Sequence, residues 1–310
     1  MFIGVDLGGT KIAVGLVDEM GNILHKESIP TGAERSDKEV VFDIANLCKK
    51  VIEDTKSNPR WIGIGAPGTT DGENGVIVYA NNINMRNTPV RKLIQQVVDL
   101  PVYIENDANC AALGEAYGGA TKNVKNSVMI TLGTGVGGGI IINKHIYSGF
   151  NFAAGELGHM VIVVDGEPCT CGRKGCWEAY SSATALIRMT KEEASKNKES
   201  LMNKMVEGDM DKVGGRTAWD AMHQGDESGK KVVDMYIKYL AEGITNIVNI
   251  FQPEILVLGG GISNERDFLI KPLITMVEER RYTRDVPQTI IKFAELGNDA
   301  GIIGAAMLGL

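Results

Sequence analysis

The sequence lacks the features that mark several large classes of protein. It has no apolar run that approaches the roughly 18–20 residues of a membrane-spanning helix. It has no excess of basic residues, because Lys and Arg total 32 against 39 Asp and Glu, a formal net charge of −7. This balance argues against a nucleic-acid-binding protein, whose contact face is normally basic. A local positive pocket for a small anion is still compatible with it.

Cysteine usage and the start of the chain point to a compartment. The five cysteines are odd in number, and three of them lie within 169–176, which argues against a disulfide framework. The first strand-like run starts at Phe2 and leaves no space for a charged and then apolar leader. We therefore expect a cytoplasmic protein that contacts neither membrane nor nucleic acid.

The chain does have apolar mass and many glycines. Of its 310 residues, 44% are hydrophobic and 23% are charged, enough to bury the cores of two packed domains or one large one. Stretches of strand and helix character alternate, which predicts the α/β class. One helix start is explicit, since Ser36 precedes Glu39 by the spacing of a capping box. The 38 glycines gather in turns.

Two glycine turns belong to a repeated plan. A strand, a turn with glycine and threonine, a strand, a turn and a third strand follow one another from near residue 2 and again from near residue 127. This indicates a duplicated core. Glycine lets backbone N–H groups surround a phosphate, and the hydroxyls of Thr10 and Thr134 add donors. Ordinary hairpins are the alternative, but two such turns at equivalent places favour phosphate binding.

Carboxylates stand at the ends of two predicted strands. Asp107 follows the strand 102–104 and precedes a helix, where an Asp or Asn commonly caps the first turn. A helix start also favours an ionised carboxylate, and ligands of open α/β sheets gather beyond the carboxyl ends of strands. Asp107 is therefore a candidate to accept a proton in phosphoryl transfer, with Asn106 as a contact to the acceptor. Asp6 suits a water-mediated contact with Mg²⁺.

One imidazole and three thiols form a candidate metal site. His159, Cys169, Cys171 and Cys176 have the composition of a closed, structural zinc centre. Buried free thiols or a disulfide are the alternatives, and a disulfide is unlikely in a cytoplasmic chain. The neighbouring carboxylates of Glu156 and Glu178 could then be fixed by the zinc and bind vicinal hydroxyls of a sugar; two surface glutamates are the alternative. Cys48 and Cys110 lie among apolar residues and are interpreted as core thiols.

These motifs together resemble the ROK family (repressors, open reading frames and sugar kinases). The resemblance runs from residue 3 to the C-terminus. Its most specific part is the segment 155–178. The segments that carry it are 6–11, 105–109, 132–139, 155–159, 169–178 and 298–301.

The resemblance implies an architecture. It is the actin-like ATPase (ribonuclease H-like) fold, an α/β fold in which two lobes with a duplicated core surround a hinged cleft. We expect a smaller N-terminal α/β lobe of residues 1–118 with 299–310, and a larger α/β lobe of residues 119–298 that contains the zinc knuckle. The family is usually dimeric or tetrameric, which implies a homodimer or homotetramer.

The resemblance also implies an activity, the transfer of the γ-phosphoryl group of ATP to the 6-hydroxyl of glucose, with Asp107 as catalytic base. His159 would place one ring nitrogen on zinc and the other toward the sugar. The residues implied to bind glucose are Gly68, Asn82, Asn106, Asp107, Glu156, His159 and Glu178. The residues implied to bind ATP and Mg²⁺ are Asp6, Gly8, Gly9, Thr10, Lys11, Gly133, Thr134, Gly135, Gly137, Gly260 and Gly261.

Other functions stay open at this point. Met85 stands where glucokinases often carry Trp, which leaves room for a kinase of N-acetylmannosamine, fructose or allose. A sugar-responsive repressor of the same family needs a helix-turn-helix ahead of the first glycine turn, and the position of Asp6 near the start argues against one. An actin-like ATPase that moves partners would not need Glu156, His159 and Glu178 beside a zinc knuckle.

Overall fold

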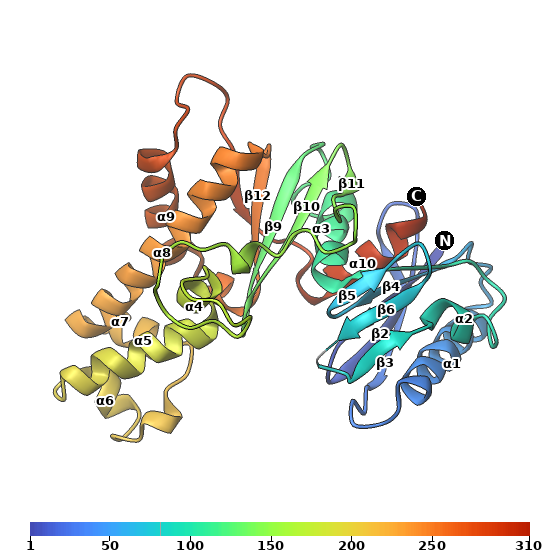
Figure 1. Ribbon diagram of the computed structural model, residues 1–310, viewed down its shortest axis with the longest axis horizontal. Coiled ribbons are helices and arrows are strands. Elements are labelled where there is room, and N and C mark those ends of the chain that lie inside the picture. Colours follow the sequence, from blue (N-terminus) through green and yellow to red (C-terminus); the bar gives the residue numbers. More distant parts are fainter. Residues whose placement is uncertain (81) are drawn as a thin grey trace. The chain divides into compact units, whose positions relative to one another are not determined.

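The computed structural model describes residues 1–80 and 82–310 (Figure 1), and it confirms the α/β class. The chain forms two compact units, and each is described by itself. The first unit comprises Met1–Met129, Gly138–Gly155 and Ala294–Leu310, and the second Ile130–Gly137 and Glu156–Phe293. The division into two hinged lobes, residues 1–118 with 299–310 and residues 119–298, stays a prediction.

The first unit is built on a five-stranded sheet in the order β3-β2-β1-β4-β8. The pairs β1–β2 and β2–β3 are antiparallel, whereas β1, β4 and β8 run parallel. The carboxyl ends of these three parallel strands therefore lie at one edge. The elements up to the end of α3 are β1 (Phe2–Leu7), β2 (Lys11–Val17), β3 (Ile23–Pro30), α1 (Asp37–Thr55), β4 (Ile62–Ala66), β5 (Thr69–Asp71), β6 (Val76–Ala80), β7 (Met85–Thr88), α2 (Val90–Ile94), β8 (Val102–Asn106) and α3 (Asp107–Gly118).

Helices cover both faces of this sheet. Ile3 and Val5 belong to a buried core with Ile44 of α1. Gly4 points the other way, where an added Cβ would lie 2.0 Å from the backbone oxygen of Ile302 in α10 (Ala300–Ala306). Because successive strand residues face opposite sides, α1 and α10 pack on opposite faces. The parallel strands are thus held from both sides, which fixes their carboxyl edge.

The second five-stranded sheet repeats the plan in the order β11-β10-β9-β12-β13. Its strands are β9 (Ser127–Leu132), β10 (Val136–Ile142), β11 (His145–Ile146), β12 (Ile255–Gly259) and β13 (Ile290–Phe293). The pair β10–β11 is antiparallel and β12–β13 is parallel. In both sheets the first strand of the repeat is central, with its two hairpin partners on one side. The predicted duplication is confirmed.

The second unit adds helices around its part of this sheet. The long helix α8 (Glu227–Phe251) ends before Pro253, with Gln252 in the left-handed conformation. Trp177 packs against α8, since its Nε1 donates to the carbonyl of Tyr239 at 3.0 Å. This contact ties the Cys-rich segment to a long rigid helix. The helices are α4 (Glu178–Ser181), α5 (Ala183–Lys196), α6 (Leu201–Met205), α7 (Thr217–His223), α8 (Glu227–Phe251) and α9 (Arg266–Arg280).

One part of the fold was not predicted from the sequence. The short strands β5, β6 and β7 form a separate three-stranded antiparallel sheet. Met85 lies in β7 and is 1% exposed, so it is a core residue here. Among the residues that the structure describes, none of the helices combines the length and the apolarity that a bilayer crossing needs.

Candidate active site

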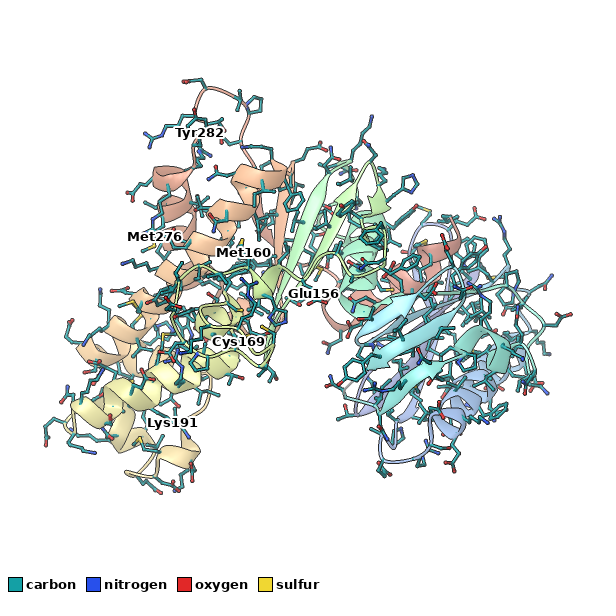
Figure 2. The ribbon with its side chains drawn as sticks, in the orientation of Figure 1. Glu156, Met160, Cys169, Lys191, Met276 and Tyr282 are labelled. Atoms are coloured by element: carbon teal, nitrogen blue, oxygen red, sulfur yellow. The ribbon has the colours of Figure 1, made fainter. Side chains whose placement is uncertain are left out.

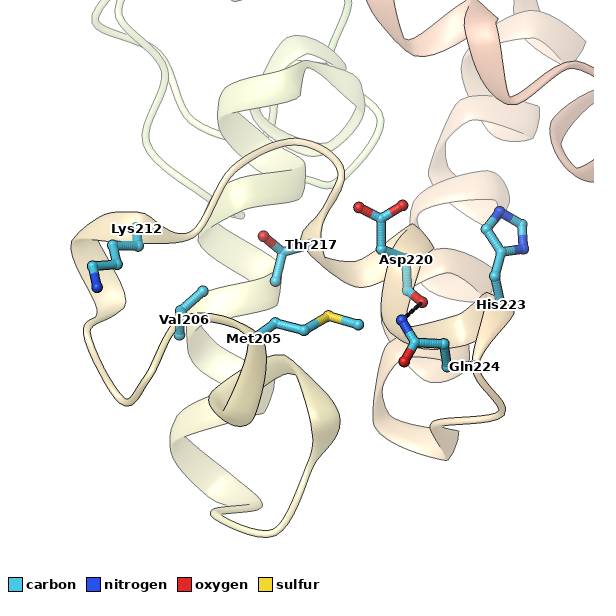
Figure 3. Close-up of a pocket in the computed structure, with 7 residues that line it drawn as sticks. All are labelled: Met205, Val206, Lys212, Thr217, Asp220, His223 and Gln224. Atoms are coloured by element: carbon cyan, nitrogen blue, oxygen red, sulfur yellow. Dashed lines mark hydrogen bonds between the residues drawn. The ribbon is translucent and has the colours of Figure 1, made fainter.

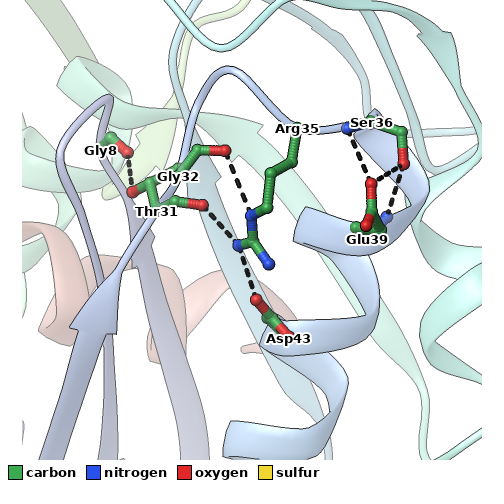
Figure 4. Close-up of polar contacts among 7 residues, drawn as sticks. All are labelled: Gly8, Thr31, Gly32, Arg35, Ser36, Glu39 and Asp43. Carbon is green, nitrogen blue, oxygen red and sulfur yellow. Dashed lines mark hydrogen bonds and ion pairs between the residues drawn. The ribbon is translucent and has the colours of Figure 1, made fainter.

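The first glycine turn connects β1 and β2, and a residue outside the turn holds it through hydrogen bonds. Within the turn, the N–H of Gly8 donates to the carbonyl of Lys11 at 2.9 Å. Thr31, which is fully buried, donates its hydroxyl to the carbonyl of Gly8 at 2.6 Å (Figure 4). Its N–H donates to the carbonyl of Thr10 at 3.0 Å. Thr31 therefore fixes the backbone of the turn at both Gly8 and Thr10.

Arg35 extends this support to α1. Its Nη2 donates to the carbonyl of Thr31 at 2.8 Å and to Oδ2 of Asp43 at 2.7 Å, and its Nε donates to the carbonyl of Gly32 at 3.4 Å (Figure 4). Sequence reasoning missed Thr31 and Arg35 because neither belongs to a glycine motif.

Asp6 is the penultimate residue of β1, beside this turn, and lies against α10. Burial raises the pKa of its carboxyl group, and the charges of Lys11 and Lys26 act in the opposite direction. Gly301 leaves the space that this side chain occupies, because a Cβ there would lie 3.3 Å from Oδ1 of Asp6. A partly desolvated carboxylate next to a phosphate-type turn suits a divalent cation that keeps its waters.

The carboxyl ends of β1, β4 and β8 align. Asp6 is in register with Gly65, and Gly65 with Glu105, so the two carboxylates stand in one row, two strands or about 10 Å apart. Cys110 packs beneath Gly65, whose added Cβ would lie 3.1 Å from its Sγ. Burial raises the pKa of the Cys110 thiol well above its ordinary value, and Glu105, Asp107 and Asp6 add to this. Cys110 is thus an inert core thiol, as predicted.

Asn106, rather than Asp107, caps α3. Its Oδ1 accepts from the N–H groups of Ala108 at 2.9 Å and Asn109 at 3.2 Å. Asp107 is the first helical residue, and its Oδ1 accepts from the N–H of Ala108 at 2.8 Å. The cap alternative considered for Asp107 therefore belongs to its neighbour, and the role of Asp107 as base stays a prediction.

Three of the predicted glucose contacts lie around this edge of the first unit. Nδ2 of Asn106 donates to the carbonyl of Gly68 at 3.0 Å. Gly68 has a φ of +83°, and a Cβ there would lie 2.1 Å from the carbonyl oxygen of Tyr79, so only glycine fits. Asn82 lies near the first turn, 3.6 Å from where a Cβ of Gly9 would stand.

The second glycine turn joins β9 and β10 and is anchored to α5. The N–H of Gly133 donates to the carbonyl of Gly135 at 3.0 Å, and the N–H of Ala183 donates to the carbonyl of Gly133 at 2.8 Å. Gly260 packs on the end of β9, because its Cβ would lie 2.3 Å from the carbonyl oxygen of Leu132. The structure thus brings together two segments predicted to bind nucleotide.

Glu178 connects this turn to the Cys-rich segment. Its Oε2 accepts from the N–H of Val136 at 3.0 Å, and its Oε1 accepts from the hydroxyl of Thr170 at 3.4 Å. A Cβ on Gly135 would lie 2.3 Å from Oε2 of Glu178, so a larger residue at this position would displace that carboxylate. The carboxylate predicted to contact sugar is therefore also a brace of the second turn.

The predicted metal ligands converge. The ligand atoms of His159, Cys169, Cys171 and Cys176 all lie within 4.8 Å of one another. Sγ of Cys169 is 3.5 Å from Nδ1 of His159, and Sγ of Cys171 is 3.6 Å from Sγ of Cys176. A tetrahedral zinc with Zn–S of about 2.3 Å and Zn–N of about 2.0 Å separates two sulfurs by about 3.8 Å and a sulfur from a nitrogen by about 3.5 Å. The donor set and its spacing fit zinc.

The knuckle that presents these ligands is shaped by glycine. Gly172 and Gly175 have φ values of +87° and +79°, and a Cβ on Gly175 would lie 1.6 Å from the carbonyl oxygen of Val163. A backbone hydrogen bond to Arg173 lowers the pKa of the Cys171 thiol, whereas burial raises that of Cys176 to about 12. The two glycines let the backbone turn sharply and pack closely, which brings the ligand side chains toward one another.

His159 presents its two ring nitrogens to different partners. Nδ1 faces Cys169, and Nε2 lies 3.9 Å from Oε2 of Glu156, whose side chain is 67% exposed. Glu156 and Cys169 both lie in the segment that follows β11 (Figure 2). The predicted double role of His159, one ring nitrogen on zinc and the other toward the sugar, stays a prediction.

The second unit also has a separate cavity of about 450 Å³ (Figure 3). Its walls come from α6, α7 and adjoining segments, and one wall residue, His223, places Nε2 3.2 Å from Oε2 of Glu265. Its lining holds none of the predicted site residues. The lining residues are Met205, Val206, Lys212, Thr217, Asp220, His223 and Gln224.

Comparison with known proteins gives this chain relatives along its whole length. The model of the ROK family matches residues 2–310. A glucokinase of Halalkalibacterium halodurans is 39% identical over 314 residues, which cover 99% of this chain and 94% of that protein. A glucokinase of Thermotoga maritima is 37% identical, over 99% of this chain and 96% of its own length.

A solved structure is similar throughout as well. The ROK family glucokinase from Streptomyces griseus, in complex with glucose and AMPPNP, matches with a TM-score of 0.80 and 35% identity, over 99% of this chain and 98% of that one. Such neighbours confirm the predicted actin-like ATPase fold.

Proposed function

This chain belongs to the ROK family, and on that premise we propose that it is an ATP-dependent glucokinase, which transfers the γ-phosphoryl group of ATP to the 6-hydroxyl of glucose. The observation that carries the proposal is the full-length similarity to glucokinases. The geometry supports it, because Asp107 opens α3 at the carboxyl edge of the first sheet while Asn106 does the capping.

The chemistry requires a proton acceptor, positioning and charge neutralisation. Asp107 accepts the proton of the sugar hydroxyl as that oxygen attacks the γ-phosphorus of ATP, the bond from this phosphorus to the bridging oxygen breaks, and ADP leaves. Lys11 and the backbone N–H groups of the two turns stabilise the phosphate oxygens. Mg²⁺, when bound, neutralises phosphate charge, and Asp6 would hold it through water.

The predicted contacts divide between nucleotide and sugar. Gly8, Gly9, Thr10 and Lys11 bind phosphate in the first turn. In the second turn the phosphate contacts are Gly133, Thr134, Gly135 and Gly137. Gly260 and Gly261 lie near the adenosine. Glucose contacts Gly68, Asn82, Asn106, Asp107, Glu156, His159 and Glu178.

Zinc is the proposed metal of the knuckle, held by His159, Cys169, Cys171 and Cys176. Four protein ligands leave no position for water, so the metal is structural. Its part in the reaction is indirect, because it fixes the segment between Glu156 and Glu178.

The proposal includes the behaviour of the whole protein. The predicted lobes, 1–118 with 299–310 and 119–298, close by a hinge and exclude water from the reaction. The protein acts in the cytoplasm as a homodimer or homotetramer, which light scattering coupled to size exclusion tests.

The test of the activity is ADP release with Mg·ATP and a panel of hexoses: glucose, N-acetylmannosamine, fructose and allose. We expect the highest kcat/KM with glucose. A preference for another hexose would correct the substrate and retain the reaction. Absence of sugar-dependent ADP release across the panel would contradict the proposal.

A further inference from the structure

Glu105 is a buried acid beside the proposed base, and the reaction as described so far gives it no task. It precedes the last residue of β8 and is 8% exposed. A carboxylate removed from water is costly unless hydrogen bonds replace its hydration. Its partners therefore indicate what the structure gains from it.

One oxygen of Glu105 binds residues on both sides of Asp107, one through its backbone N–H and the other through its side-chain amide. Oε1 accepts from the N–H of Asn106 at 2.8 Å and from Nδ2 of Asn109 at 3.1 Å. Asn106 precedes Asp107, and Asn109 follows two positions later. Asp107 therefore lies between two residues that are hydrogen-bonded to the same carboxylate oxygen of Glu105.

The other oxygen holds the segment 148–155. Oε2 accepts from the hydroxyl of Ser148 at 2.8 Å. The segment closes on itself, since the N–H of Ala154 donates to the carbonyl of Ser148 at 3.0 Å. Its last residue, Gly155, also lies against α3, because a Cβ there would stand 3.6 Å from Oδ1 of Asn109. The start of the segment is therefore bound to Glu105 of β8 and its end lies against α3, and the chain continues from it into Glu156.

We propose that Glu105 is a positioning residue for phosphoryl transfer. Its two carboxylate oxygens join the first turn of α3 and the segment 148–155 into one rigid piece, so that Asp107 is held in its reactive orientation before the sugar arrives. This inference rests on the proposed function, because it acts through Asp107 as base. A displacement of about 1 Å at a reacting group can lower a rate by about 10²-fold.

Because the proposed contribution of Glu105 is geometric, two substitutions of this residue should differ in their effect on turnover. In E105Q the amide oxygen can accept both bonds that Oε1 accepts, and the Ser148 hydroxyl can rotate to accept from the amide nitrogen. In E105A all three bonds are lost. Glu115 of α3 gives a control, since it is also a buried carboxylate, 1% exposed, and accepts backbone N–H bonds near the opposite end of that helix.

The experiment measures kcat and both KM values for wild type, E105Q, E105A and E115Q at a temperature where circular dichroism shows each variant folded. We expect E105A to lose about 10²-fold in kcat with the KM for ATP changed less than about twofold. E105Q should lose no more than about fivefold, and E115Q should match wild type. Normal turnover of E105A would overturn the proposal, and so would an equal loss in E105Q and E105A, because charge would then be the property that matters.

A double-variant cycle separates positioning from general damage. If Glu105 acts through Asp107, E105A should cost less than about twofold when added to D107N, since the group that it positions is already inactive. A full additional loss would overturn the proposal. Wild-type protein without glucose-dependent ADP release would instead contradict the proposed function itself, so the two failures are distinguishable.

Discussion

Burial determines the properties of single side chains at the carboxyl edge of β1 and β8. Burial raises the pKa of Asp6 despite the nearby charges of Lys11 and Lys26, and it raises that of the Cys110 thiol much further. A thiol so placed stays protonated and inert. A carboxylate so placed is destabilised when ionised, which suits a group whose partner is a cation.

The first prediction concerns Asp6. Because burial raises its pKa in the folded chain above the ordinary value of 3.8, its ionisation favours the unfolded chain. The free energy of unfolding of the wild type therefore falls as the pH rises from 3.8 through the raised pKa of Asp6. Without nucleotide, D6N should melt at a higher temperature than wild type at pH 7, and this difference should shrink toward pH 4, while Mg·ATP-dependent activity falls by about 10²-fold or more. A D6N variant less stable than wild type at pH 7 would contradict this account.

The second prediction concerns Thr31. T31V keeps the shape of the side chain but removes the hydroxyl that donates to Gly8, which should raise the KM for ATP by about 5-fold to 10-fold, or about 1 kcal/mol, and leave the KM for glucose unchanged. T190V is the control, because Thr190 is also fully buried and donates to the carbonyl of Leu186 at 2.7 Å. Equal KM values for ATP in T31V and wild type would refute a role for Thr31 in the turn.

At the scale of residues, the sequence predicted groups that are close in the chain. The convergence of His159 with three cysteines followed from their spacing, and a polar pair at the start of α3 followed from the end of a strand. Glu105, Thr31 and Ser148 were missed because their hydrogen bonds reach 43 or 23 positions along the chain. Only the folded sheet brings such partners together.

At the scale of elements, the Cys-rich knuckle supports its neighbours. Its ligands fit zinc, and Glu178 links it to the second glycine turn through Val136. Loss of the metal should therefore loosen a turn as well as the knuckle.

The third prediction tests that link. C171S should lose zinc, measured by atomic absorption, and its affinity for glucose, measured by calorimetry, should fall by about 10-fold or more, since three ligands hold zinc less tightly than four. C48A is the control, because Cys48 is a buried core thiol of α1 whose pKa burial raises to about 12. Lost zinc with unchanged glucose affinity would refute the supporting role of the knuckle.

Elements with strong local signals were predicted and short ones were not. The capping box of α1 follows from a local rule of capping, because Ser36 and Glu39 stand three positions apart. The strands β5, β6 and β7 are three to five residues long. So few residues carry too little alternation to identify a strand.

At the scale of the whole molecule, one buried carboxylate ties distant parts of the first unit together. Glu115 of α3 accepts from the N–H of Ala120 at 2.7 Å, of Glu295 at 3.0 Å and of Leu296 at 2.9 Å. Residues 295 and 296 lie just after the chain re-enters the first unit at Ala294. Glu115 therefore fixes the point from which α10 returns to the sheet.

The fourth prediction follows from these bonds. E115A leaves buried N–H groups without a partner, at about 1–3 kcal/mol each, so the free energy of unfolding should fall by about 3 kcal/mol or more in urea titrations. E242A, which removes a half-exposed ion pair with Arg280, should change it by less than about 1 kcal/mol. Similar stability of E115A and wild type would show that the return of the chain is fixed by other contacts.

The central claim is that Asp107 takes the proton of the glucose 6-hydroxyl during phosphoryl transfer from ATP. The most direct measurement is kcat of D107N together with its dissociation constant for glucose. Removal of a general base lowers turnover by about 10²-fold to 10⁴-fold, so we predict a loss in that range with glucose affinity within about threefold of wild type. Turnover near the wild-type value would contradict the claim.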